Sequence, residues 1–178
     1  TELGEKIREL LLGREQEGMD PLAELMLYEA ARAQVIADVI KPALLAGKVV
    51  ICDRFTDSTV AYQGYGRELG PGLVDRLNAL VTGDCRPDRT IMLALDPKLA
   101  RERVLDRSAD GQPDRMESAG RSFNERMLEG FERIAESDPD RIRTVDAQGD
   151  IETVFSRVVE QLADLFSAAG ISLEGDAR

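Results

Sequence analysis

Histidine and tryptophan are both absent from the 178 residues of this chain. Without histidine the chain can form no His-based catalytic triad and no imidazole metal site, and it lacks the usual general acid or base of neutral pH. Its two cysteines, Cys52 and Cys85, have none of the short spacings of a zinc site, and such low usage is typical of a reducing compartment. Because Cys52 follows an apolar run, we expect a buried free thiol there.

The chain also lacks an excess of positive charge, since its formal net charge is −11. A protein that binds nucleic acid usually carries a basic footprint, so we expect no nucleic-acid partner. No apolar run approaches the length needed to cross a membrane, and we expect a cytoplasmic protein without a membrane partner. A small anionic ligand is still compatible with this charge, because a local cluster of arginines is enough to bind it.

Helical and strand-like segments alternate along the chain, which predicts an α/β fold with a parallel sheet covered by helices on both faces. We expect a single domain over residues 1–169, a mobile lid at about 108–120 and a frayed tail at 170–178. The expected strands are 48–53, 89–95 and 141–147, and the expected helices are 2–12, 20–46 with a kink at Pro42, 71–82, 96–107, 121–137 and 150–168.

A dense group of polar residues follows the first expected strand, in the stretch DRFTDSTVAYQGYGR at 53–67. In sheets of this kind, ligands bind beyond the carboxyl ends of the strands. An acid in the place of Asp53 can hold a metal-bound water, and an arginine in the place of Arg54 can bind phosphate oxygens with two hydrogen bonds. The alternative for this pair is a simple ion pair that caps the strand.

More hydrogen-bonding side chains follow on the same stretch, and others lie upstream. A glutamine can read the edge of a base by paired hydrogen bonds, and a tyrosine can form the wall of a sugar site. Upstream, an aromatic residue and an arginine four apart share one helix face, where they could bind a base, or could equally be a half-buried tyrosine beside a solvated arginine. The residues concerned are Ser58, Thr59, Tyr62 and Gln63 on the polar stretch, and Tyr28 and Arg32 upstream.

The expected lid and its flanks carry Arg107, Arg115 and Arg121. A polar segment with arginines between two helices suits a lid that closes over phosphates and excludes water. The alternative is a charged surface loop.

Several of these stretches resemble the bacterial thymidylate kinase family. DRFTDSTVAYQGYGR is similar to its signature, LYEAARAQVIADVIKPAL to its thymine-side helix, and RPDRTIMLALDP to one of its strands. DRME, FNERMLEGF and TELGEKIRELLL resemble the exit of its lid, the helix that follows and the segment after its TREPGG loop. The resemblance runs in order over about residues 1–165.

The resemblance implies a P-loop NTPase-like fold, a homodimer, and transfer of a phosphoryl group from ATP to dTMP with Mg²⁺, giving dTDP on the route to dTTP. It places Arg54 at the dTMP phosphate, Asp53 at the metal, and Tyr62 behind the deoxyribose. It places Tyr28 and Arg32 at the thymine, together with Thr59 and Gln63, which Ser58 supports. It makes Arg107, Arg115 and Arg121 candidates for binding the transferred phosphates.

One departure from the family is large, because the motif GxxxxGK[ST] occurs nowhere in the sequence. That loop cradles the phosphates of ATP, so we expect an N-terminal portion with the first strands to be missing, and the chain by itself to be inactive. Two other functions stay open: a non-catalytic nucleotide-binding domain that has lost the ATP loop, and a kinase of another nucleotide.

Overall fold

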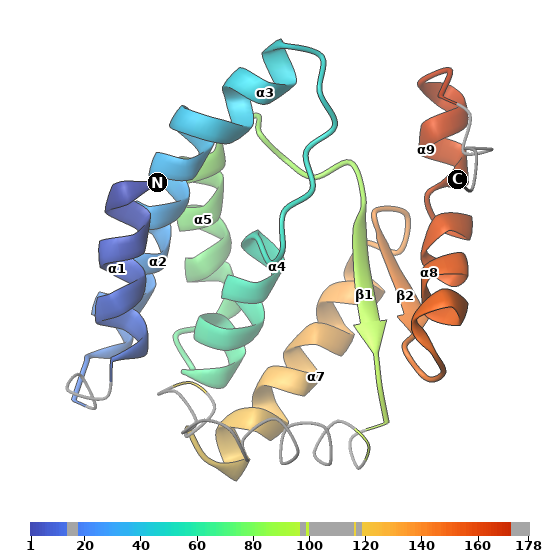
Figure 1. The fold of residues 1–178 in the computed structure, drawn as a ribbon. Coiled ribbons are helices and arrows are strands. Elements are labelled where there is room, and N and C mark those ends of the chain that lie inside the picture. The colour runs from blue at the N-terminus through green and yellow to red at the C-terminus, as the bar shows by residue number, and fades with distance from the viewer. Residues whose placement is uncertain (14–17, 97–98, 100–115, 117–118, 172–178) are drawn as a thin grey trace. The chain divides into compact units, whose positions relative to one another are not determined.

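The computed structural model describes residues 1–13, 18–96, 99, 116 and 119–171 (Figure 1). The chain divides into two compact units. The first comprises Thr1–Arg86 with Gln112–Ile134, and the second comprises Pro87–Gly111 with Ala135–Arg178. In the part of the chain so described, no helix is long and apolar enough to cross a membrane.

The first unit is helical in its described residues. Helix α1 (Glu2–Leu12) packs against α2 (Pro21–Val35), and α2 packs against α5 (Pro71–Thr82) (Figure 1). The elements are α1 (Glu2–Leu12), α2 (Pro21–Val35), η2 (Ile36–Ile40), α3 (Lys41–Leu45), α4 (Thr56–Thr59), η3 (Val60–Gly66), α5 (Pro71–Thr82) and most of α7 (Arg121–Ser137).

Helix α2 begins where the sequence predicts it to begin. The Asp20 side chain accepts hydrogen bonds from the amides of Leu22 and Ala23, and Pro21 occupies the first helical position, where its missing N–H costs nothing. The helix expected over 20–46 is interrupted by the wide π turn η2, and Pro42 lies in the helix α3 that follows it. The kink expected at Pro42 stays a prediction.

The core of the first unit joins α2, η3 and α5. Leu25 and Val74 are fully buried and Val60 nearly so. Tyr65, Leu69, Leu77 and Ile134 pack around these three side chains. This core holds α2 against the helical segment 56–66, and these are the elements that carry most of the predicted site.

The second unit contains two parallel strands, β1 (Thr90–Ala94) and β2 (Ile142–Asp146), in register from Thr90 opposite Ile142 to Ala94 opposite Asp146. Both strands and their parallel pairing confirm the prediction. Helix α8 (Ile151–Glu160) packs against β2, and α9 (Ala163–Ala168) follows it. The helix expected over 150–168 is therefore interrupted, and Arg89 donates to the Gln161 carbonyl at this break.

Two expectations about the segment before the polar stretch are wrong. Residues 48–53 form no strand, and the side chain of Ile51 is 93% exposed. An extended segment becomes a strand only through hydrogen bonds to a neighbour, and among the described residues the sheet contains β1 and β2 alone. Cys52 is correspondingly exposed instead of buried, and its thiol contacts the Arg54 carbonyl oxygen at 3.3 Å. The expected helix 96–107 and lid 108–120 lie almost wholly outside the described residues.

Candidate functional site

Two helical segments bring the predicted base-binding residues together. On α2, Glu24, Tyr28 and Arg32 are four residues apart and therefore share one face. Along the segment 56–66, Thr59 and Gln63 are likewise four apart. Arg32 pairs with Thr59 and Glu24 pairs with Gln63, so the two segments run in opposite directions with Tyr28 between the two pairs.

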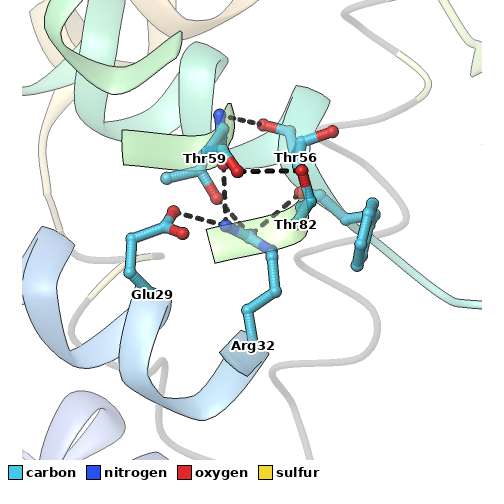
Figure 2. Close-up of polar contacts among 7 residues, drawn as sticks. Glu29, Arg32, Thr56, Thr59 and Thr82 are labelled. Carbon is cyan, nitrogen blue, oxygen red and sulfur yellow. Dashed lines mark hydrogen bonds and ion pairs between the residues drawn. The ribbon is translucent and has the colours of Figure 1, made fainter. Parts of the chain in front are cut away.

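Arg32 is the centre of a buried hydrogen-bond network (Figure 2). Its Nη1 donates to a carboxylate oxygen of Glu29 and to Oδ1 of Asn78, the latter at 2.9 Å. Its Nη2 donates to the Thr59 hydroxyl and, at 3.2 Å, to the Phe55 carbonyl oxygen. These partners exclude the alternative of a solvated arginine at this position.

The network holds the polar stretch in place as well as the arginine. Asn78 of α5 accepts from Arg32 and donates through Nδ2 to the Thr56 carbonyl oxygen at 3.4 Å. The Arg32 guanidinium also lies 5.3 Å from the centroid of the Phe55 ring. All four Nη hydrogens of Arg32 therefore have partners, so a base carbonyl would have to replace one of them or approach Nε.

Glu29 was not predicted from the sequence. It is 3% exposed, its Oε1 is the ion-pair partner of Arg32, and its Oε2 has no hydrogen-bond partner among the described residues. The signal for it was its position three residues before Arg32, where helical side chains meet.

Arg54 and Tyr62 form a second cluster. Arg54 has a left-handed backbone with φ of 64°, and its Nη1 donates to the Tyr62 hydroxyl at 3.1 Å. Its guanidinium lies 5.2 Å from the centroid of that ring. Two further rings from α7, Phe123 and Phe131, meet Tyr62 edge-on with centroids 6.1 Å away. The Arg54 guanidinium therefore lies over the Tyr62 ring, which in turn contacts two aromatic rings of α7.

Asp53 is exposed beside Arg54, in a loop and not at the end of a strand. In the described part of the chain no three acidic or cysteine side chains gather in a way that could hold a metal ion. A single exposed carboxylate is compatible with Mg²⁺, which keeps several of its waters and takes few protein ligands.

The structure brings together most of the predicted residues, but not all of them. Tyr28 and Ser58 are half-buried on the two segments that carry the Arg32 network. Arg107 and Arg115 lie outside the described residues. Arg121 begins α7, where its exposed side chain pairs with Glu125 on the same helix, Nε to Oε1 at 2.7 Å.

A buried acid on α2, Glu24, is a further residue that sequence reasoning missed. It binds Gln63 and Arg67, which lie 39 and 43 residues further along the chain. The only sequence signal for it was that it occurs one turn before Tyr28 on the helix face that also carries Arg32.

Known proteins that are similar to this chain share one family. The profile of the thymidylate kinase family matches residues 1–158. The thymidylate kinase of Gloeobacter violaceus is 47% identical over 158 residues, which are 89% of this chain and 74% of that protein. The thymidylate kinase of an Exiguobacterium species is 39% identical over 171 residues, covering 96% of this chain and 79% of that protein.

A solved structure gives the same result for the fold. The crystal structure of thymidylate kinase from Ehrlichia chaffeensis superposes with a TM-score of 0.68 at 34% identity, over 89% of this chain and 72% of that one. By sequence and by fold, the chain belongs to the thymidylate kinase family.

Proposed function

We propose that this chain acts in the transfer of a phosphoryl group from ATP to dTMP, which yields dTDP and ADP. The observation that carries the proposal is the cluster in which Arg32 of α2 and Thr59 of the opposite segment bond each other beside Tyr28, in a chain of this family. The cluster contains an aromatic ring, a guanidinium group and a hydroxyl group. A thymine ring could stack on the first, and its carbonyl could bind the guanidinium through Nε or by replacing one of the partners of Nη.

The second cluster fits the remainder of a nucleoside monophosphate. In this proposal Arg54 binds the phosphate, and Tyr62 lies behind the deoxyribose. Sugar and phosphate are adjacent in dTMP, and the proposal is supported by the hydrogen bond of 3.1 Å that joins the Arg54 and Tyr62 side chains. Tyr28 stacks on the thymine, and Gln63 contacts its edge.

For the chemical step, positioning and neutralisation of charge matter more than a strong base, so the absence of histidine is no obstacle. Mg²⁺ would neutralise charge on the ATP phosphates, with Asp53 holding its waters. Arg107, Arg115 and Arg121 are the candidate lid cations of the proposal. A P-loop NTPase-like fold, a homodimer and a cytoplasmic location belong to the same proposal.

Residues 1–178 contain no phosphate-cradling GxxxxGK[ST] motif, and for that reason we expect no turnover from them alone. A second candidate is a domain that binds the nucleotide without catalysis. Both candidates require dTMP to bind, whereas only the first requires turnover in the presence of a phosphate-cradling loop.

The proposal is tested by thermal unfolding of the chain with dTMP, thymidine and UMP. A ligand that binds only the native state raises the melting temperature. We expect dTMP to raise it most, and Arg54→Met to abolish the advantage of dTMP over thymidine, because only dTMP carries the phosphate. Arg133→Met is the matched control, since Arg133 is an exposed arginine paired with Glu129 on its own helix. A native wild-type chain that melts at the same temperature with and without dTMP would contradict the proposal.

A further inference from the structure

Glu24 is a buried carboxylate that holds two side chains of the opposite segment. Its exposed fraction is 0%. Its Oε1 accepts from Nε2 of Gln63 at 2.8 Å and from Nε of Arg67 at 3.1 Å, and its Oε2 accepts from Nη2 of Arg67 at 3.0 Å. A buried charge is retained only where it is well paired, and here a two-point arginine contact satisfies that condition.

The pairing determines which way the amide of Gln63 faces. A glutamine amide has a donor end and an acceptor end, which normally can exchange by a flip of the side chain. A carboxylate can only accept hydrogen bonds, so the end that meets Glu24 must be the NH₂ group. The end that Gln63 can offer to a ligand is therefore the carbonyl oxygen, Oε1.

Arg67 keeps the carboxylate from turning away. Its guanidinium binds both oxygens of Glu24 and lies 4.8 Å from the centroid of the Phe123 ring, while Nη2 also lies 3.6 Å from Sδ of Met116. An arginine fork held on two sides fixes the plane of the carboxylate that it binds. The orientation of Gln63 is thus set by a rigid partner.

The orientation of the Gln63 amide can distinguish pyrimidines that carry a hydrogen on N3 from those that do not. Ring nitrogen N3 carries a hydrogen in thymine and uracil, whereas in cytosine it carries only a lone pair. The Oε1 atom, which is the end of the amide that does not meet Glu24, accepts a hydrogen bond from the first kind of ring and opposes a lone pair of the second. We infer that Glu24 is a positioning residue, which by fixing the amide of Gln63 makes the site select monophosphates whose N3 is protonated and reject dCMP. The inference rests on the proposed function, in that it takes the base to lie against Gln63.

The inference is tested by measuring the dissociation constants of dTMP, dUMP and dCMP by calorimetry on the wild-type chain and on Glu24→Gln. The new amide has an NH₂ group, so Gln63 can turn and present its own NH₂ to the ligand. We expect the preference for dTMP over dCMP to fall by about tenfold or more, because a hydrogen-bonding mismatch is removed. The preference for dTMP over dUMP should stay the same, because both rings carry the N3 hydrogen.

Two further variants keep the test decisive. Gln63→Met removes the amide but leaves Glu24 paired with Arg67, and it should lose the same preference even if Glu24→Gln does not fold. Val74→Ala is the structural control, since it opens a cavity in the core. It should lower the melting temperature without changing the preference for dTMP over dCMP or over dUMP. A folded Glu24→Gln or Gln63→Met chain with the wild-type ratio of dTMP to dCMP would overturn the inference while the proposed function stands. A wild-type chain that binds no dTMP would overturn both.

Discussion

An added methyl group at Gly130 tests the packing of α7 directly. An alanine Cβ there would lie 2.8 Å from Cδ2, 2.9 Å from Cβ and 2.9 Å from Cγ of Tyr65. Contacts between carbon atoms normally lie at about 3.5–4.0 Å, so Tyr65 or the helix must move. One of the three atoms is a Cβ attached to the backbone, so rotating the ring cannot relieve the clash.

Helix propensity and packing predict opposite changes in the free energy of unfolding of Gly130→Ala. Helix propensity predicts that Gly130→Ala stabilises the chain by about 1 kcal/mol, since the position is inside a helix. Overpacking costs about 1–3 kcal/mol. We expect the packing cost to dominate, with a net loss of about 1 kcal/mol, which corresponds to a melting temperature lower by about 2–4 °C.

Gly72→Ala is the matched control, because a Cβ at that helical position meets only Nη1 of Arg76, at 3.9 Å. It should melt at or slightly above the wild-type temperature. Calorimetry and denaturant unfolding of both variants make the comparison. We further expect Gly130→Ala to reduce the stabilisation by dTMP, since its neighbour Phe131 packs on Tyr62. If Gly130→Ala is as stable as Gly72→Ala, the contact between α7 and η3 is not as described.

Three other substitutions test the elements that carry the site. Arg32→Met leaves the Glu29 carboxylate buried without its partner, so the free energy of unfolding in urea should fall by about 3 kcal/mol; an unchanged value would contradict the network. Asp20→Ala removes the N-cap of α2 and should cost about 1 kcal/mol, whereas Asp20→Ser should restore most of it. Burial, followed by the nearby charge of Asp57, raises the pKa of Asp75. A raised native pKa stabilises the protonated form, so this stability is present at low pH and is lost as pH rises. Asp75→Asn should therefore have a higher melting temperature than the wild type at neutral pH and the same melting temperature at about pH 3. Equal melting temperatures at both pH values would contradict the raised pKa of Asp75.

Local signals predicted the helices well and the tertiary partners poorly. The start of α2 could be predicted because Asp20 and Pro21 act on backbone groups a few residues away. The β-branched residues of 48–53 predicted a strand that does not form, since strand formation depends on a neighbouring strand as well as on the residues themselves. The exposure of Cys52 follows from the same cause.

Prediction of the site shows the same limit. Arg32 and Gln63 were proposed as site residues from their chemical type and from their resemblance to the family, and the structure shows each of them buried and hydrogen-bonded across the two segments. Glu24 and Arg67 were missed because their roles arise from a pairing across 43 residues, which no periodicity reveals. The partners of Arg32 on α5 were likewise invisible, since Asn78 has no special spacing to it along the chain.

The backbone of Arg54 has a consequence for how this protein tolerates change. A non-glycine residue at φ of 64° loses roughly 1 kcal/mol or more relative to an ordinary conformation. Glycine would adopt the same backbone without that cost, so Arg54→Gly should leave the fold intact or even more stable while removing the proposed phosphate ligand. Selection for stability alone would therefore favour loss of this arginine. Under the proposed function, its presence is a place where the chain gives up stability for phosphate binding.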